Sequence, residues 1–204
     1  YYLPERAPTT QDFLHTPNKG ANTIRVAVVG DSFTFAPFMQ LDDAFPKRLE
    51  RWLNLNEQQP KVEVINYGVP RYSTSHEIAV VEQAIQDHAD LILLHITLND
   101  PEIKPFRPDG RIVEERGVED ASWIIQNWHS LRYILGRLRN STSHSEYKEY
   151  YFKLFEDPKN WKSFSRSLKS IVLKAKQAKV PLVATVFPLF GYPVDVSYPF
   201  FPLH

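Results

Sequence analysis

The stretch Ile24-Arg-Val-Ala-Val-Val-Gly-Asp-Ser32 decides the fold class of this chain. Its first six residues form a run that is apolar at nearly every position and rich in β-branched side chains. Such a run is typical of a strand buried on both faces of a parallel sheet. Gly30 ends the run, and Asp31 and Ser32 follow directly. Because ligands bind at the carboxyl ends of strands in open α/β sheets, this turn is a candidate functional site.

Strand and helix patterns alternate through the rest of the chain. Further strands are predicted over Val62–Ile65, Leu91–Ile96 and Leu182–Phe187, which are apolar for most of their length. Segments with apolar residues at helical spacing separate these strands. The alternation predicts an α/β fold with a parallel sheet whose crossovers are right-handed.

Three helices are predicted from their starting signals and their apolar stripes. Asp42-Asp43 is a cap for the first, the capping-box pattern Thr74-x-x-Glu77 starts the second, and Asp157 followed by Pro158 starts the last. The predicted buried faces consist of Phe45, Leu49, Trp52 and Leu53, then Ile78, Val81, Ala84 and Ile85, and finally Phe164, Leu168, Ile171, Val172 and Ala175.

We expect a single domain over residues 1–204, because domains usually have roughly 100–200 residues. Residues 1–22 show no sustained period and are interpreted as an N-terminal arm. Residues 101–157 break the rhythm of strands and helices. We interpret them as an insertion that packs over one end of the sheet, with a helix over residues 122–139, and as a candidate lid.

The composition excludes several classes of protein. The chain has 24 basic and 24 acidic residues, so its net charge of zero argues against nucleic-acid and anionic membrane partners. The absence of cysteine removes disulfide scaffolds, cysteine nucleophiles and thiolate metal sites. No apolar run reaches the roughly 18 residues that a membrane-spanning helix needs.

Small polar motifs follow the first three predicted strands, and parallel strands put all three on one edge of the sheet. They are Gly30-Asp31-Ser32, Asn66-Tyr67-Gly68 and Thr97-Leu98-Asn99-Asp100. A serine hydroxyl acts as a nucleophile in acyl transfer when a base takes its proton, and the resulting oxyanion needs preorganised donors. The N–H groups of Ser32 and Gly68 and the amide of Asn99 are suitable donors.

These motifs resemble those of the SGNH (GDSL-type) hydrolases. Val29-Gly-Asp-Ser-Phe-Thr34 is similar to the first block of that family, Asn66 to Thr74 to the second, and Leu98-Asn99-Asp100 to the third. The resemblance covers Ile24 to Asp100 by motif, and extends to about Pro188 by element order. It implies a doubly wound, flavodoxin-like fold of three layers. It also implies ester hydrolysis through an acyl-enzyme on Ser32, with Gly68 and Asn99 as oxyanion donors and no metal or other cofactor.

The chain departs from the family pattern at two places. Thr97 stands where the third block usually has glycine. The family's base lies in an Asp-x-x-His block after a fifth strand, and the pattern occurs here only as Asp12-Phe-Leu-His15, before the first strand. We interpret that occurrence as a coincidence. We therefore expect the fifth strand and the catalytic base to belong to a C-terminal part that the given chain lacks.

Other polar residues have simpler interpretations. Asp31 either shapes the oxyanion site or only stabilises its loop. His95 lies in an apolar strand and is interpreted as a core histidine with satisfied hydrogen bonds. His129 and His144 belong to the insertion, and His204 is interpreted as a loop residue near the correct edge of the sheet.

The leading hypothesis is a serine esterase that acts on a small-molecule or carbohydrate ester, either as a carbohydrate O-deacetylase or as a short-acyl esterase. The alternatives are a non-catalytic binding or accessory module, including a partner of an O-acyltransferase, and a phosphate binder. The absence of a glycine-rich phosphate cradle weakens the last of these. Family members with an N-terminal extension are often exported or membrane-anchored bacterial proteins, which favours an extracytoplasmic location over a cytoplasmic one.

Overall fold

The computed structural model describes residues 19–37, 39–56, 60–103, 149–188, 198 and 200–203. Most of the predicted N-terminal arm lies outside the described residues. The same is true of the central part of the predicted insertion, with its helix and its two histidines, and of His204. The description below therefore concerns the sheet, the helices that cover it and the loops that follow its strands.

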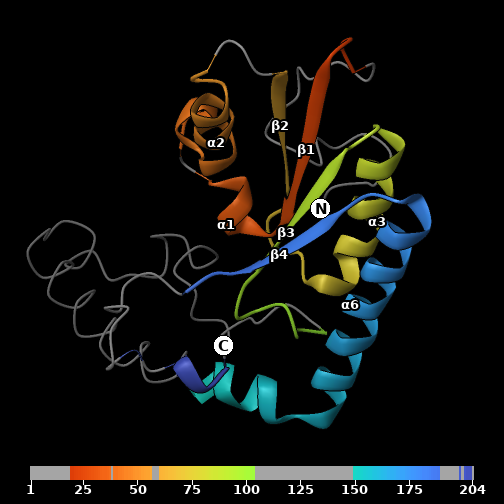
Figure 1. Cartoon of the computed structure of the whole chain (residues 1–204). Coiled ribbons are helices and arrows are strands. Elements are labelled where there is room, and N and C mark those ends of the chain that lie inside the picture. The colour runs from red at the N-terminus through yellow and green to blue at the C-terminus, as the bar shows by residue number, and fades with distance from the viewer. Residues whose placement is uncertain are drawn as a thin grey trace, which may run out of the picture.

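The described strands form a four-stranded parallel sheet in the order β2-β1-β3-β4 (Figure 1). They are β1 (Thr23–Gly30), β2 (Lys61–Gly68), β3 (Leu91–Ile96) and β4 (Leu182–Val186). This sheet confirms the predicted α/β fold. The chain runs outward from β1 to β2 and then returns to the other side of β1. The loops after β1 and β3 therefore border the point where the winding reverses, at which such sheets bind ligands.

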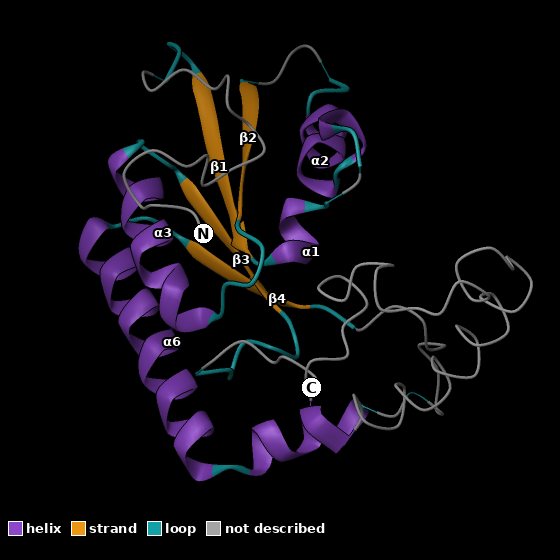
Figure 2. Ribbon diagram, turned by 180° about the vertical axis from the view of Figure 1, so that it is seen from behind, coloured by secondary structure: helices purple, strands orange, loops and turns teal. Residues whose placement is uncertain are grey.

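Helices cover both faces of the sheet and give three layers (Figure 2). On one face lie α1 (Ser32–Phe35) and α2 (Phe45–Leu53), and on the other lie α3 (Thr74–Gln86) and α6 (Pro158–Ala178). Two 3-10 helices, η1 (Leu41–Asp43) and η3 (Phe201–Leu203), and the helical residues 149–156 complete the described helical structure.

Strand β1 is buried on both faces, as its apolar run predicts. Val26 and Val28 pack with residues of α2, including Leu49, on one side of the sheet. Ala27 and Val29 pack in a larger cluster with residues of α3 and α6 on the other side. Because successive side chains of a strand point to opposite faces, every residue of such a central strand meets a covered surface.

The start of α3 differs from the prediction. Ser73 is the N-cap instead of Thr74, and the Ser73 N–H donates to Nδ1 of His76 at 3.3 Å. Thr74 Oγ1 instead donates to Oδ1 of Asp100 at 2.9 Å, and Glu77 is fully buried. The predicted capping box was therefore wrong by one residue, because Asp100 engages the Thr74 hydroxyl and Glu77 is buried instead of reaching back to the cap.

The cap of α2 and the exposure of two helical residues also differ from the prediction, whereas the cap of α6 is confirmed. Ala44 is the N-cap of α2, because Asp42 and Asp43 belong to η1. Trp52 is 67% exposed and Val172 is 46% exposed, so the prediction that they belong to the buried faces of their helices was wrong. Asp157 caps α6 in the predicted way.

Strand β4 ends at Val186, one residue before the predicted end. It pairs with β3 on one side, and no described strand pairs with its other side. Four of its five residues are exposed, among them Val183 at 49% and Val186 at 52%. Among the described strands, β4 is thus an edge strand with apolar side chains in contact with solvent.

Candidate active site

Ser32 lies where β1 turns into α1. Asp31 is the N-cap of this four-residue helix, and its Oδ1 accepts a hydrogen bond from the Phe33 N–H at 2.9 Å. Such a cap fixes the first turn of a helix. Ser32 is half-buried, and its hydroxyl makes no hydrogen bond with any residue that the structure describes. The cap therefore holds Ser32 at the carboxyl edge of the sheet.

Two glycines let α1 approach the ends of the strands. A Cβ on Gly30 would lie 2.3 Å from Thr34 Oγ1, and a Cβ on Gly68 would lie 2.2 Å from the backbone nitrogen of Phe35. Gly30 and Gly68 are also register partners of β1 and β2. Glycine is required at both positions because the turn that carries Ser32 occupies the space that a side chain would fill.

The N–H of Gly68 is engaged within its own strand end. It donates to Asn66 Oδ1 at 3.0 Å, so the donor that the sequence analysis assigned to the oxyanion already has an acceptor. Further along the same loop, Arg71 has a left-handed backbone with φ 69°, and its N–H has no partner among the described residues. No sequence signal pointed to Arg71, since non-glycine residues seldom adopt this conformation.

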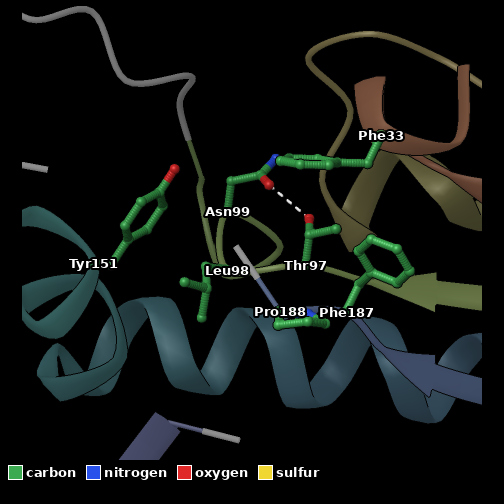
Figure 3. Close-up of a pocket in the computed structure, with 7 residues that line it drawn as sticks. All are labelled: Phe33, Thr97, Leu98, Asn99, Tyr151, Phe187 and Pro188. Carbon is green, nitrogen blue, oxygen red and sulfur yellow. Dashed lines mark hydrogen bonds between the residues drawn. The ribbon is translucent and has the colours of Figure 1, made fainter. Parts of the chain in front are cut away.

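The loop after β3 brings Asn99 to the turn that holds Ser32. Thr97 Oγ1 lies 2.6 Å from Asn99 Oδ1 and 2.9 Å from Asp31 Oδ2. Asn99 Nδ2 donates to the carbonyl of Tyr72 at 3.4 Å. Figure 3 shows the amide of Asn99 with its oxygen turned toward Thr97. The structure thus joins the first and third motifs through side chains, and the second motif through the backbone of its loop.

Three buried carboxyl groups lie behind this edge of the sheet. Asp31, Glu77 and Asp100 are at most 2% exposed. Burial raises the pKa of Asp31, and it raises the pKa of Asp100 to about 7 with help from the nearby Asp31 carboxyl. Burial also raises the pKa of Glu77 well above its usual range, and neither of its oxygens has a partner among the described residues. Burial therefore shifts all three groups toward their neutral forms.

A pocket opens beside Asn99, and its walls are mainly apolar (Figure 3). They come from α1, the loop after β3, the helical residues before α6 and the end of β4. The lining residues are Phe33, Thr97, Leu98, Asn99, Tyr151, Phe187 and Pro188. Ligand sites commonly combine such walls with a few polar groups that fix the orientation of the ligand.

His95 is a core histidine, as predicted, but its hydrogen bonds are not all satisfied, because its buried Nε2 has no partner among the described residues. It is 1% exposed, and its Nδ1 lies 2.7 Å from Thr34 Oγ1. Burial lowers the pKa of His95 to about 4, so the ring is neutral at pH 7. The residue has no contact with Ser32, and the described part of the chain supplies no base to the Ser32 hydroxyl.

The described residues contain no group of three or more His, Cys, Asp or Glu side chains that could hold a metal ion. In the same part of the chain, no helix is both long enough and apolar enough to cross a membrane.

No family model matches the sequence, and no curated protein matches it. Among solved structures, the chain is similar to AlinE4, described as an SGNH-hydrolase family esterase. The identity is 12% and the TM-score 0.46, over 89% of this chain and 67% of that chain. A mutant of esterase AlinE4 gives the same identity and TM-score over 86% of this chain, which spans 64% of the mutant's length. TesA gives 13% identity and a TM-score of 0.35 over 78% and 76% of the two chains.

Proposed function

We propose that this protein is a serine-dependent ester hydrolase that forms an acyl-enzyme on Ser32. The observation that supports it best is the position of the Thr97 hydroxyl, 2.9 Å from Asp31 Oδ2 and 2.6 Å from Asn99 Oδ1. This contact fastens the turn of the candidate nucleophile to the loop of an amide donor. Acyl transfer needs both groups, and both lie at the edge of the sheet where ligands bind.

In the proposed reaction, Ser32 Oγ attacks the ester carbonyl carbon, the alcohol leaves, and water then releases the acid. The Ser32 N–H and Asn99 Nδ2 donate to the oxyanion. The Gly68 N–H joins them only if it leaves Asn66 Oδ1. The N–H of Arg71, on the loop next to Asn99, is a further donor that does not have to break a bond.

The base of the proposed reaction is a histidine that a carboxylate orients. His95 does not serve, because Thr34 and two aromatic rings enclose it in the core. We therefore assign the base to a residue outside the described part of the chain. We assign the acyl group to the pocket beside Asn99, and the small size of this pocket favours a short one. Deacetylation of a carbohydrate and hydrolysis of a short-acyl ester both fit this proposal.

A non-catalytic binding or accessory role, including that of a partner of an O-acyltransferase, is the second candidate. The observation that favours it is the Ser32 hydroxyl, which no described residue deprotonates. A nucleophilic serine without a base is a weak nucleophile. In this role, the same pocket would hold an ester or an acyl group without turnover.

Hydrolysis of p-nitrophenyl acetate by the intact protein tests the proposal. Ser32→Ala is expected to lower kcat/KM by about 10³-fold or more, as for other nucleophilic serines. Ser170→Ala, the same substitution on α6, is the control and is expected to keep the wild-type rate. Equal rates for the wild type and Ser32→Ala would contradict the assignment. A fluorophosphonate probe supplies an independent readout, because it labels an activated Ser32 and leaves a binding module unlabelled.

A further inference from the structure

The Thr97 hydroxyl lies between two oxygen atoms. Its Oγ1 is 2.9 Å from Asp31 Oδ2 and 2.6 Å from Asn99 Oδ1. A threonine hydroxyl has one hydrogen, so it donates to one of these oxygens and must accept a hydrogen from the other side. An ionised carboxylate and an amide oxygen have no hydrogen to donate. Either Asp31 is therefore protonated, or the amide of Asn99 is reversed.

The other contact of Asn99 decides between these two forms. Its Nδ2 lies 3.4 Å from the carbonyl oxygen of Tyr72, which is an acceptor. A reversed amide would place Oδ1 against that carbonyl, and two acceptors would face each other. The assignment of amide oxygen and nitrogen follows from such networks. The orientation with Oδ1 toward Thr97 satisfies both neighbours, and Thr97 then donates to Asn99.

We propose that Asp31 is protonated on Oδ2 in the active protein and donates to Thr97 Oγ1, while Thr97 donates to Asn99 Oδ1. The hydrogen bonds then run in one direction, from the acid to the amide. Oδ1 of Asp31 remains the acceptor for the Phe33 N–H. The inference rests on the proposed function, because it makes Asp31 and Thr97 positioning residues for an oxyanion donor.

Burial and the neighbouring carboxyl groups favour the protonated form of Asp31, whereas the hydrogen bond from the Phe33 N–H favours its charged form. The titratable groups that face it are Asp100, on the loop after β3, and Glu77, on α3. Both are buried carboxyls, and a charge on either of them would repel a charge on Asp31. Within the described residues, no lysine or arginine pairs with any of the three. A proton on Asp31 removes the cost of burying its charge.

The direction of these hydrogen bonds, from Asp31 through Thr97 to Asn99, affects how strongly the Asn99 amide can donate. Hydrogen bonds in a chain polarise one another, so an amide whose oxygen accepts a bond donates more strongly through its nitrogen. If Asp31 loses its proton, Thr97 must turn its hydrogen to the carboxylate, and Asn99 Oδ1 loses its donor. Burial raises the pKa of Asp31. Activity is therefore kept at a pH below that pKa and is lost as the pH rises through it.

Three variants of the intact protein test the proposal with p-nitrophenyl acetate. Thr97→Val removes the hydroxyl and is expected to lower kcat by about 10- to 100-fold with little change in KM. Thr97→Ser keeps the hydroxyl and is expected to recover most of that loss. Asp31→Asn supplies a neutral donor of the same shape. Its kcat is expected to fall less than that of Thr97→Val. In a plot of activity against pH, the fall at alkaline pH that Asp31 causes should be absent from this variant.

Two results would overturn the proposal. One is a loss of activity at alkaline pH that has the same midpoint pH in Asp31→Asn as in the wild type. The other is a Thr97→Ser variant as slow as Thr97→Val, which would show that the hydroxyl does not position Asn99. Unfolding temperatures of the three variants check that each is folded.

An infrared measurement tests the protonation without turnover. The difference spectrum between the wild type and Asp31→Asn isolates the Asp31 carboxyl group. A band of a protonated acid at neutral pH is expected, and a carboxylate band there overturns the proposal. If the wild type and Ser32→Ala hydrolyse the ester equally, the proposed function fails. The infrared spectrum still reports on the proton, so the two failures are distinguishable.

Discussion

Thr34 Oγ1 lies 2.7 Å from Nδ1 of His95, and this contact joins the first turn of α1 to β3 behind the candidate nucleophile. The His95 ring packs edge-on against Phe45 and Phe187, with centroid distances of 5.3 and 4.5 Å. Its Nε2 is buried and has no partner among the described residues. A proton on this ring would place a charge among apolar groups, which makes His95 a source of acid sensitivity.

We expect the contribution of His95 to the free energy of unfolding to fall as the pH is lowered from 6.5 to about 4, whereas the buried carboxyls Glu77 and Asp100, whose pKa values are raised, contribute in the opposite direction. Burial lowers the pKa of His95 from 6.5 to about 4, so the unfolded chain binds a proton over this range before the folded chain does. The contribution is fully present above pH 6.5 and is lost progressively below it. Urea unfolding at a series of pH values measures the slope. His95→Gln should remove this contribution, so that its stability falls less, or rises more, than that of the wild type as the pH is lowered; equal slopes would contradict the expectation.

Gly68→Ala is expected to lower the free energy of unfolding by about 3 kcal/mol, in the range of overpacked or strained sites. The new Cβ would lie 2.2 Å from the backbone nitrogen of Phe35, which cannot move without displacing α1. Gly20→Ala is the matched control, since its Cβ would lie 3.1 Å from a threonine side chain in an exposed turn. Similar unfolding curves for both variants would show that α1 does not lie tightly against β2.

Arg25→Leu is expected to cost about 3 kcal/mol of stability, because removal of one partner leaves a polar network incomplete. Arg25 is fully buried in β1, and its Nε donates to Glu63 Oε2 at 2.9 Å. Its guanidinium also donates to the carbonyl of Asp87. Arg51→Leu on the exposed side of α2 is the control. Chemical denaturation measures both variants, and equal losses would mean that the buried network contributes nothing.

If the proposed ester hydrolysis holds, Tyr151→Ala is expected to shift its preference toward longer acyl groups. Tyr151 forms one wall of the pocket beside Asn99, so its removal makes room for additional methylene groups. The ratio of kcat/KM for p-nitrophenyl butyrate over the acetate should rise by about tenfold, as expected when a pocket gains space for methylenes. Trp161→Ala, a half-exposed aromatic on α6, should leave the ratio unchanged. An unchanged ratio in Tyr151→Ala would place the acyl group elsewhere.

The strands of the parallel sheet could be predicted well, because burial on both faces leaves a plain signal. The residues from Val26 to Val29 are all apolar since each meets a covered face. The capping of α3 could not be predicted in the same way. The hydroxyl of Thr74 binds Asp100, which is 26 residues away in the chain, and local patterns carry no information about such a partner.

The candidate site could be predicted at the level of its loops and less well at the level of hydrogen bonds. The motifs around Ser32 and Asn99 come to one edge because parallel strands end there. Which acceptor the Gly68 N–H chooses depends on the rotamer of Asn66, which the sequence does not express. Glu77 was predicted only as a member of a capping box, and its burial could not be predicted, since buried glutamates are rare.

The open side of β4 bears on how this protein behaves when it is concentrated. Its exposed valines flank a row of backbone groups that pair with β3 on one side only, among the described strands. Such an edge accepts further strands, including those of other molecules, and natural proteins often guard it with charged side chains. Val183→Lys would place a charge on this strand and is a simple means of keeping samples monodisperse for crystallisation or NMR.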